Sequence, residues 1–89
     1  MTKTILVTGS TDGIGLLTAQ LLTERGHEVL LHGRSEDKLA TAAERVGGRS
    51  KTFAADLSRM AEVEALASAV LAEHEQIDVL INNAGVFHT

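Results

Sequence analysis

Three triplets of consecutive apolar residues, at residues 5–7, 29–31 and 79–81, are separated by longer stretches of mixed polarity in this 89-residue sequence. A run of consecutive apolar residues is typical of a strand that is covered on both faces in a parallel sheet. Segments with helical spacing lie between the triplets, and a weaker strand is expected around residues 51–54. The order β-α-β-α-β-α-β predicts right-handed crossovers and a three-layer α/β fold, part of a doubly wound, Rossmann-type parallel sheet.

Each of the three helical segments has an expected apolar face. The first face comprises Ile14, Leu17, Leu21 and Leu22, the second Leu39, Ala43 and Val46, and the third Met60, Val63, Leu66, Val70 and Leu71. Residue types also predict where helices begin and end. We expect Gly26 to end the first helix, and Ser35 and Ser58 to cap the N-termini of the second and third.

The composition limits the partners of the chain. Residues 1–89 are enough for at most one small domain with a modest core. A net charge of −4 without a run of lysine and arginine argues against binding to nucleic acid or to a membrane surface. The sequence has no cysteine, no signal-peptide core and no apolar span of about 20 residues, so we expect a cytoplasmic protein without disulfides.

Three glycines lie between the first expected strand and the first helix, in the stretch TGSTDGIG at residues 8–15. Glycine allows a sharp turn and close approach of the backbone, and the N–H groups that open the next helix attract an anion. The Gly-x-x-x-Gly-x-Gly spacing is one residue longer than the usual dinucleotide fingerprint. We interpret this stretch, the glycine-rich loop, as a pyrophosphate-binding loop; a tight turn without a ligand is the alternative.

Gly33 and Arg34 end the second expected strand. They lie about 20 residues beyond the glycine-rich loop, where dinucleotide-binding folds contact the adenosine ribose. An acidic residue there accepts the ribose 2′-hydroxyl and repels a 2′-phosphate, whereas the guanidinium of Arg34 matches a phosphate bidentately. The sequence therefore favours NADP(H), with NAD(H) as the alternative cofactor. The competing interpretation of Arg34 is a solvated surface arginine.

Polar residues also follow the third and fourth expected strands. Asp56 could accept a hydrogen bond from an adenine amino group, or it could be a turn residue that bonds nearby backbone N–H groups. Asn82 opens the stretch Asn-Asn-Ala-Gly at residues 82–85. Two amides followed by two small residues suit a strand end where the sheet is braced and the backbone opens towards a ligand, with a plain turn as the alternative.

Together these motifs make the chain resemble the short-chain dehydrogenase/reductase family. The resemblance spans essentially all 89 residues, but only the N-terminal, cofactor-binding portion of the family. It implies phosphate and ribose contacts at the glycine-rich loop, a 2′-phosphate contact at Arg34, adenine contacts at Asp56 and Leu57, and a bracing role for Asn82. The implied cofactor-binding residues are Gly9, Ser10, Thr11, Asp12, Gly13, Ile14, Gly15, Arg34, Asp56, Leu57, Asn83, Ala84 and Gly85.

The resemblance assigns no catalytic residue within this sequence. Members of the family transfer hydride between a nicotinamide and a carbonyl or alcohol substrate with a Tyr-x-x-x-Lys pair, a serine and an asparagine. The sequence contains no tyrosine, and Lys3, Lys38 and Lys51 all precede the region where the catalytic lysine would lie. We therefore expect a single NAD(P)-binding domain that ends before the catalytic half and is inactive alone, with the substrate unknown.

The histidines offer a weak metal motif. His27 and His32 flank a stretch similar to a zinc-protease motif, but they lie on an expected strand and cannot share a helix face. His74 and His88 are expected to be solvated, because one lies near a helix end and the other near the chain terminus. We predict no metal site.

Three functional hypotheses follow from the sequence. The favoured one is the cofactor-binding part of an NADP(H)-dependent oxidoreductase. The second is a non-catalytic dinucleotide-binding or redox-sensing module, which titration with NADPH and NADH tests. The third is an assembly protein, homo-oligomeric through the apolar sheet edge expected at residues 79–81, which light scattering tests.

Overall fold

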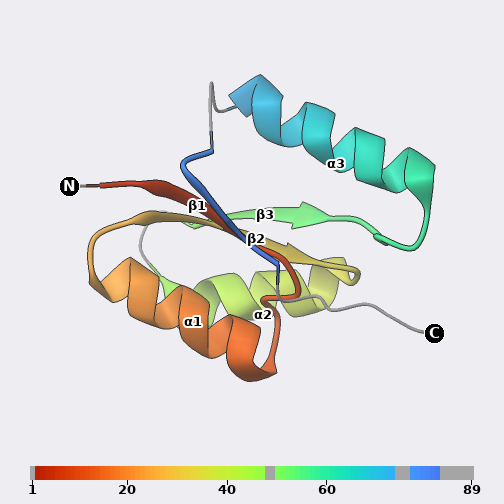
Figure 1. The fold of residues 1–89 in the computed structure, drawn as a ribbon. Helices are drawn as coiled ribbons and strands as arrows, with labels where there is room; N and C mark the ends of the chain where they lie inside the picture. Colours follow the sequence, from red (N-terminus) through yellow and green to blue (C-terminus); the bar gives the residue numbers. More distant parts are fainter. Residues whose placement is uncertain (1, 48–49, 74–76, 83–89) are drawn as a thin grey trace.

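One sheet of four parallel strands forms the centre of the fold (Figure 1). In the computed structural model, which describes residues 2–47, 50–73 and 77–82, the strands are β1 (Thr4–Val7), β2 (Glu28–Gly33), β3 (Lys51–Ala54) and β4 (Val79–Ile81). Their order across the sheet is β3-β2-β1-β4. The chain thus moves outward from β1 in one direction and then crosses back to place β4 on the other side of β1.

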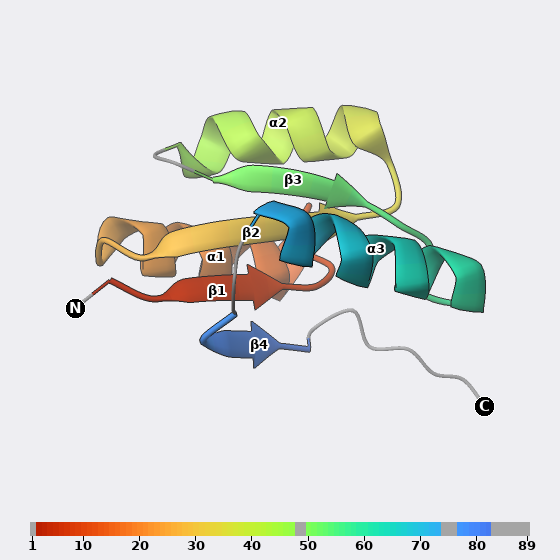
Figure 2. The same cartoon turned by 90° about the horizontal axis from the view of Figure 1, so that it is seen from above.

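In the described part of the chain, three helices cover the two faces of this sheet. Helices α1 (Gly13–Glu24) and α2 (Glu36–Val46) lie on one face, and α3 (Met60–Glu73) lies on the other, as Figure 1 and Figure 2 show. Each helix connects two parallel strands. The predicted element order and the three-layer, doubly wound α/β architecture are therefore confirmed.

Alternate residues of each strand face opposite helix layers, as the pleat of a strand requires. Ile5 and Val7 pack with α1 and α2, whereas Leu6 packs with α3. Two apolar clusters result. The first contains Ile5, Val7, Leu16, Ala19, Val29, Leu31, Leu39 and Ala42, and the second contains Leu6, Leu30, Phe53, Ala55, Leu66 and Val70.

Helix α1 packs with a different face from the expected one. Its buried residues are Gly15, Leu16 and Ala19, with Leu22 half-buried beside them. The prediction was therefore wrong except at Leu22, because three of its members are exposed: Ile14, Leu17 and Leu21. The helix has two apolar stripes, and the stripe with Gly15 and Ala19 faces the sheet because small residues let the helix approach closely.

The predicted ends of two helices are confirmed. Ser35 caps α2 by accepting a hydrogen bond from the amide of Lys38 at 3.2 Å. Gly26 follows the end of α1 with a φ of 91°, a left-handed conformation that glycine adopts readily at helix ends. The expected apolar face of α2 is also confirmed, with Leu39 buried and Ala43 and Val46 half-buried.

Helix α3 departs from its sequence pattern in two respects. The helix begins at Met60, and the hydroxyl of Ser58 donates to the carboxylate of Asp56 at 2.7 Å, so the predicted cap at Ser58 was wrong. The expected apolar face is correct for three residues, with Leu66 and Val70 buried and Val63 half-buried, but Met60 and Leu71 are exposed. Leu71 follows Val70 directly, and one residue turns a helix by about 100°.

Strand β4 forms one edge of the sheet in the described part of the chain. The amide of Thr4 donates to the carboxylate of Asp78 at 2.8 Å, and the amide of Asp78 donates to the carbonyl of Thr4 at 2.9 Å. These bonds attach the start of β4 to β1. Val79 and Leu80 are nevertheless exposed, as predicted for this apolar edge. No helix among the described residues has the length and apolar character needed to span a membrane.

Candidate cofactor-binding site

The carboxyl ends of all four strands lie on the same side of the molecule (Figure 2). The glycine-rich loop follows β1, Arg34 follows β2, Asp56 lies just beyond β3, and Asn82 follows β4. Because β1 lies between β2 and β4, the strand order reverses beside the glycine-rich loop. In open α/β sheets, ligands bind at such a switch point.

Two glycines of the glycine-rich loop are required by its backbone conformation. Gly9 has a φ of 62° and Gly13 a φ of 59°, in the left-handed region that residues with a Cβ rarely adopt. A Cβ on Gly13 would meet no atom of the chain within 4 Å, so the requirement there is conformational. Gly15 differs from both, because it is buried in the face of α1 that packs on the sheet.

Helix α1 begins without a side-chain cap. Asp12 stands at the N-cap position and its carbonyl accepts from the amide of Leu16 at 3.2 Å, but its side chain makes no cap hydrogen bond. The first turn of α1 has no acidic residue, whereas α2 is capped by Ser35 and has Glu36 and Asp37 in its first turn. The first amides of a helix have no acceptor inside it, so α1 presents donors and the positive end of its dipole to an anion.

Ser10 is fully buried and bonds to the end of β2. Its amide donates to the carbonyl of His32 at 2.8 Å, its hydroxyl donates to the same oxygen at 3.3 Å, and its hydroxyl accepts from the amide of His32 at 2.9 Å. These bonds extend the pairing of β1 with β2 into the glycine-rich loop. They give Ser10 a bracing role, and its contact with a cofactor stays a prediction.

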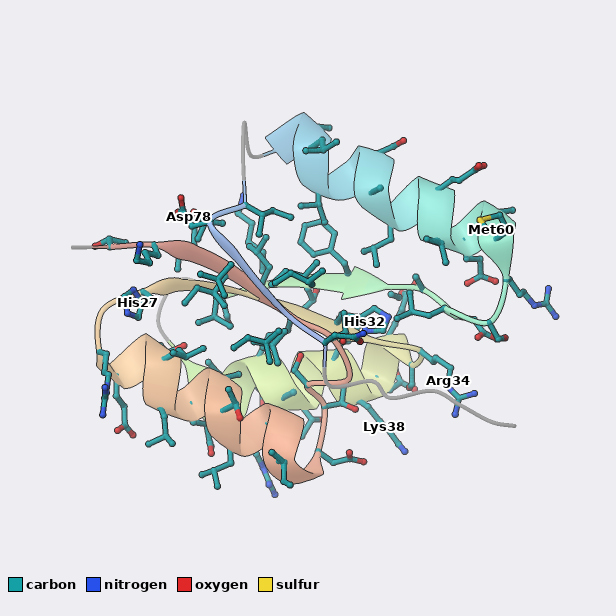
Figure 3. All side chains as sticks on the ribbon, viewed as in Figure 1. His27, His32, Arg34, Lys38, Met60 and Asp78 are labelled. Atoms are coloured by element: carbon teal, nitrogen blue, oxygen red, sulfur yellow. The ribbon has the colours of Figure 1, made fainter. Side chains whose placement is uncertain are left out.

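The sequence pattern gives His32 no role outside a rejected metal motif, yet its buried side chain lies between two loops of the site. Its Nδ1 lies 3.0 Å from the amide nitrogen of Gly9, and its Nε2 lies 2.9 Å from the carbonyl oxygen of Ala55. Figure 3 shows His27 at the opposite end of β2. The sequence did contain one indication of this role: a histidine within an apolar strand is expected to be buried, and a buried polar ring needs hydrogen-bond partners.

Asp56 is held in a turn by Ser58. The hydroxyl of Ser58 donates to Oδ1 of Asp56 at 2.7 Å, and the amide of Ser58 donates to the same atom at 3.0 Å. These bonds hold the pKa of the Asp56 carboxyl below its usual value, and the positive charges of Arg34 and Arg59 act in the same direction. Asp56 is therefore a turn residue that bonds a nearby backbone N–H, which is one of the two roles expected from the sequence. Its contact with adenine stays a prediction.

Basic side chains lie beside the glycine-rich loop. Arg34 is exposed at the end of β2 and Lys38 is exposed on the first turns of α2, and Figure 3 shows both projecting outward. A groove of about 330 Å³ separates Thr11 and Asp12 of the loop from α2. Two cations and one carboxylate stand on its α2 wall, which comprises Asp37, Lys38, Thr41, Ala42 and Arg45. Lys38 and Arg45 line this groove, whereas Arg34 is not among its lining residues.

The other predicted contacts have different surroundings. Ile14 is exposed at the start of α1, and Leu57 is half-buried against the second apolar cluster. The side-chain oxygen of Asn82 accepts from the hydroxyl of Thr8 at 3.3 Å, which agrees with the predicted bracing of β1 and β4. Three predicted contacts lie outside the described residues: Asn83, Ala84 and Gly85.

Known proteins are similar to this chain in both sequence and fold. A family model described as short chain dehydrogenase matches residues 3–89. An uncharacterized oxidoreductase of Emericella nidulans is 44% identical over 82 residues, which are 92% of this chain and 32% of the relative.

Two solved structures contain a nicotinamide cofactor. A metagenomic short-chain oxidoreductase in complex with NADP is 39% identical, with a TM-score of 0.87 over 94% of this chain and 39% of that one. An actinorhodin polyketide ketoreductase with NADPH is 36% identical, with a TM-score of 0.87 over 96% of this chain and 34% of that one. The present chain thus spans between 32% and 39% of the length of these three proteins.

Proposed function

Because this chain belongs to the short-chain dehydrogenase family, we propose that residues 1–89 form the NADP(H)-binding domain of an oxidoreductase. The observation that carries the proposal is the uncapped N-terminus of α1 directly after the glycine-rich loop. Backbone amides and the helix dipole at such a terminus suit the negative charge of a pyrophosphate. The NADP and NADPH in two structures of the same fold support this choice of ligand.

The proposal gives each part of the site one task. The amides around residues 10–14 bind the pyrophosphate, and Gly9 and Gly13 permit the loop conformation that aims them. Asp56 and Leu57, in the loop between β3 and α3, bind the adenine, while residues 83–85 contact the adenosine side. Ile14, exposed at the start of α1, lies where a bound cofactor would cover it.

Arg34 is proposed to select NADP(H) over NAD(H). It occupies the end of β2, where dinucleotide-binding folds place the residue that contacts the ribose 2′ position. A planar guanidinium binds a phosphate through two parallel hydrogen bonds, and Lys38 adds a second positive charge nearby. Glu36 and Asp37 act against this preference, so NAD(H) remains the alternative cofactor.

The bound cofactor would supply the hydride donor or acceptor, and the residues described here would bind and orient it. The proposed reaction of the whole protein is hydride transfer between the nicotinamide and a carbonyl or alcohol substrate. We expect the catalytic residues and the substrate pocket to lie in parts of the protein outside these 89 residues. A dinucleotide-binding or redox-sensing module without hydride transfer is the alternative, and it shares the same binding step.

Calorimetric titration of the 89-residue chain with NADPH and NADH tests the proposal, with substitutions at the two ends of α1 as a matched pair. Gly13 and Gly26 both have positive φ and open space around a Cβ, so Gly13→Ala and Gly26→Ala should lower stability similarly, by about 1–2 kcal/mol. We expect NADPH to bind the wild type more tightly than NADH and Gly13→Ala to weaken binding, while Gly26→Ala leaves the affinity unchanged. Absence of binding heat for both nucleotides would contradict the proposal.

A further inference from the structure

A single buried imidazole joins two loops of the candidate site. His32 is 2% exposed, at the carboxyl end of β2. Its Nδ1 contacts the amide of Gly9 in the glycine-rich loop, and its Nε2 contacts the carbonyl of Ala55, between β3 and α3. Because β2 lies between β1 and β3 in the sheet, the ring connects the loop that follows β1 to the loop that follows β3.

The two partners determine which ring nitrogen carries the proton. The N–H of Gly9 can only donate, so Nδ1 of His32 must be the acceptor. The carbonyl of Ala55 can only accept, so Nε2 must be the protonated donor. This tautomer satisfies both nitrogens at a buried position, where an unpaired polar atom costs free energy.

Both loops also bond to the main chain of β2. Ala55 is held a second time, because its own amide donates to the carbonyl of Gly33 at 3.0 Å. Gly9 has a left-handed conformation in the middle of the turn, and its orientation sets the direction of the amides that follow. Ser10, the next residue, bonds to the main chain of His32. The side chain and main chain of one residue thus fix two consecutive residues of the glycine-rich loop.

We propose that His32 is a positioning residue for the phosphate-binding loop, with its Nδ1 holding the Gly9 amide so that the amides at the start of α1 converge on one anion. Its Nε2 ties this loop to the one that contains Asp56, so the two ends of the adenosine diphosphate site keep a constant separation. His32 acts through Gly9 and touches no cofactor atom. This inference rests on the proposed function, because it concerns the site where the dinucleotide would bind.

Two amide substitutions separate the tasks of the two ring nitrogens. In His32→Asn, the side-chain oxygen takes the place of Nδ1 and still accepts from the amide of Gly9. In His32→Gln, the longer side chain brings an NH₂ group to the place of Nε2, where it still donates to Ala55. The pair is matched because both side chains are uncharged carboxamides.

We expect His32→Asn to lose less NADPH affinity in calorimetric titration than His32→Gln, because Ala55 keeps its bond to Gly33 when the Nε2 contact is lost. His32→Gln should raise the Kd for NADPH about fivefold to tenfold, the size of effect that one hydrogen bond produces. If the ring only filled space in the core, both variants would weaken binding alike. Equal losses in the two variants, or unchanged affinity in both, would overturn the proposal.

Nitrogen-15 NMR tests the same contact without a nucleotide. In the wild type we expect a ring proton on Nε2 and a scalar coupling between Nδ1 of His32 and the amide nitrogen of Gly9. The amide signals of residues 9–13 should move in His32→Gln and stay near their wild-type positions in His32→Asn. A proton on Nδ1, or the same loop shifts in both variants, would overturn the proposal.

The two measurements distinguish this inference from the proposed function. A wild-type chain that shows the Gly9 coupling and the expected loop shifts but binds neither NADPH nor NADH would refute the cofactor site and leave the loop positioning intact. A chain that binds NADPH but lacks the coupling would refute the role of His32 alone. If His32→Gln does not fold, the wild-type coupling together with the affinity of His32→Asn decides the question.

Discussion

The methyl carbon of Thr11 occupies the space that a side chain on Gly33 would need. A Cβ on Gly33 would lie 2.5 Å from Cγ2 of Thr11, whereas non-bonded carbon atoms prefer separations of about 3.5–4.0 Å. Gly33 ends β2, and Thr11 belongs to the glycine-rich loop. The loop after β1 can therefore lie directly against the end of β2 because the residue there has no side chain.

The substitution Gly33→Ala should disturb both stability and the candidate site. The added methyl group must displace Thr11, and inserting a methyl into a packed region costs about 1–3 kcal/mol. We expect a lower free energy of unfolding in urea and weaker NADPH binding in calorimetry, because the displaced residue lies in the glycine-rich loop, which we propose binds the pyrophosphate.

The substitution Thr11→Ser provides the control for this prediction, because serine lacks the methyl carbon that meets the new Cβ. In the double variant, Thr11→Ser should restore part of the stability and affinity lost in Gly33→Ala, as expected for residues in contact. Additive losses would show that Thr11 does not cause the constraint at Gly33.

Replacing Arg34 by aspartate should change which nucleotide the chain prefers. Loss of a charge-assisted contact of about 1.5–3 kcal/mol corresponds to about a tenfold to hundredfold rise in the Kd for NADPH. The Kd for NADH should change much less, because NADH has no 2′-phosphate. Arg25→Asp is the matched control: it makes the same charge change at the end of α1, away from the carboxyl ends of the strands. An equal loss of affinity for both nucleotides in Arg34→Asp would exclude a 2′-phosphate contact.

The stability that Asp56 contributes should depend on pH. Its pKa is lowered from the ordinary value of 3.8, so the folded state is favoured above that pH, and the contribution is lost as pH falls through the lower folded-state pKa. Asp56→Asn should therefore reduce the urea midpoint at pH 7, and its difference from the wild type should shrink below pH 3.8.

The hydrogen bond from the hydroxyl of Ser58 is the largest cause of the lowered pKa of Asp56. In a Ser58→Ala background, the effect of Asp56→Asn should consequently vary less with pH. A difference between wild type and Asp56→Asn that stays constant from neutral to acidic pH would contradict the assignment.

Much of the fold could be predicted because its causes are local in the sequence. Consecutive apolar residues at 5–7, 29–31 and 79–81 all form parallel strands, and the helical segments between them leave few connections that satisfy right-handed crossovers. Ser35 caps α2 through a bond to Lys38, three residues away. Patterns of this kind depend on neighbours in the sequence and need no knowledge of the tertiary structure.

The site was predictable in its motifs but not in its internal bonds. The positions of the glycine-rich loop, Arg34 and Asp56 just after three strands could be predicted from the sequence, whereas their contacts with a cofactor stay predictions. The bonds of His32 to Gly9 and Ala55 each join residues 23 positions apart. They depend on the register of β1, β2 and β3 in the finished sheet, which residue types alone do not determine.

The orientation of α1 was wrongly predicted for a related reason. Its two apolar stripes are both consistent with helical spacing, so periodicity alone cannot decide which one faces the sheet. Leu16 is 8% exposed and packs in the first apolar cluster, whereas the adjacent Leu17 is 55% exposed. The small residues Gly15 and Ala19 on the stripe of Leu16 give the tertiary reason, because they bring that side of the helix against the strands.

This adjacent pair of leucines gives a direct test of the packing of α1. Leu16→Ala should lower the free energy of unfolding by about 2–5 kcal/mol, because it removes buried methyl groups and leaves a cavity. Leu17→Ala should change it by about 0.5 kcal/mol or less, since an exposed substitution in a helix affects few contacts. Both variants have the same composition and helix propensity, so the difference in their urea midpoints isolates burial. A greater loss in Leu17→Ala would mean that the opposite stripe of α1 faces the sheet.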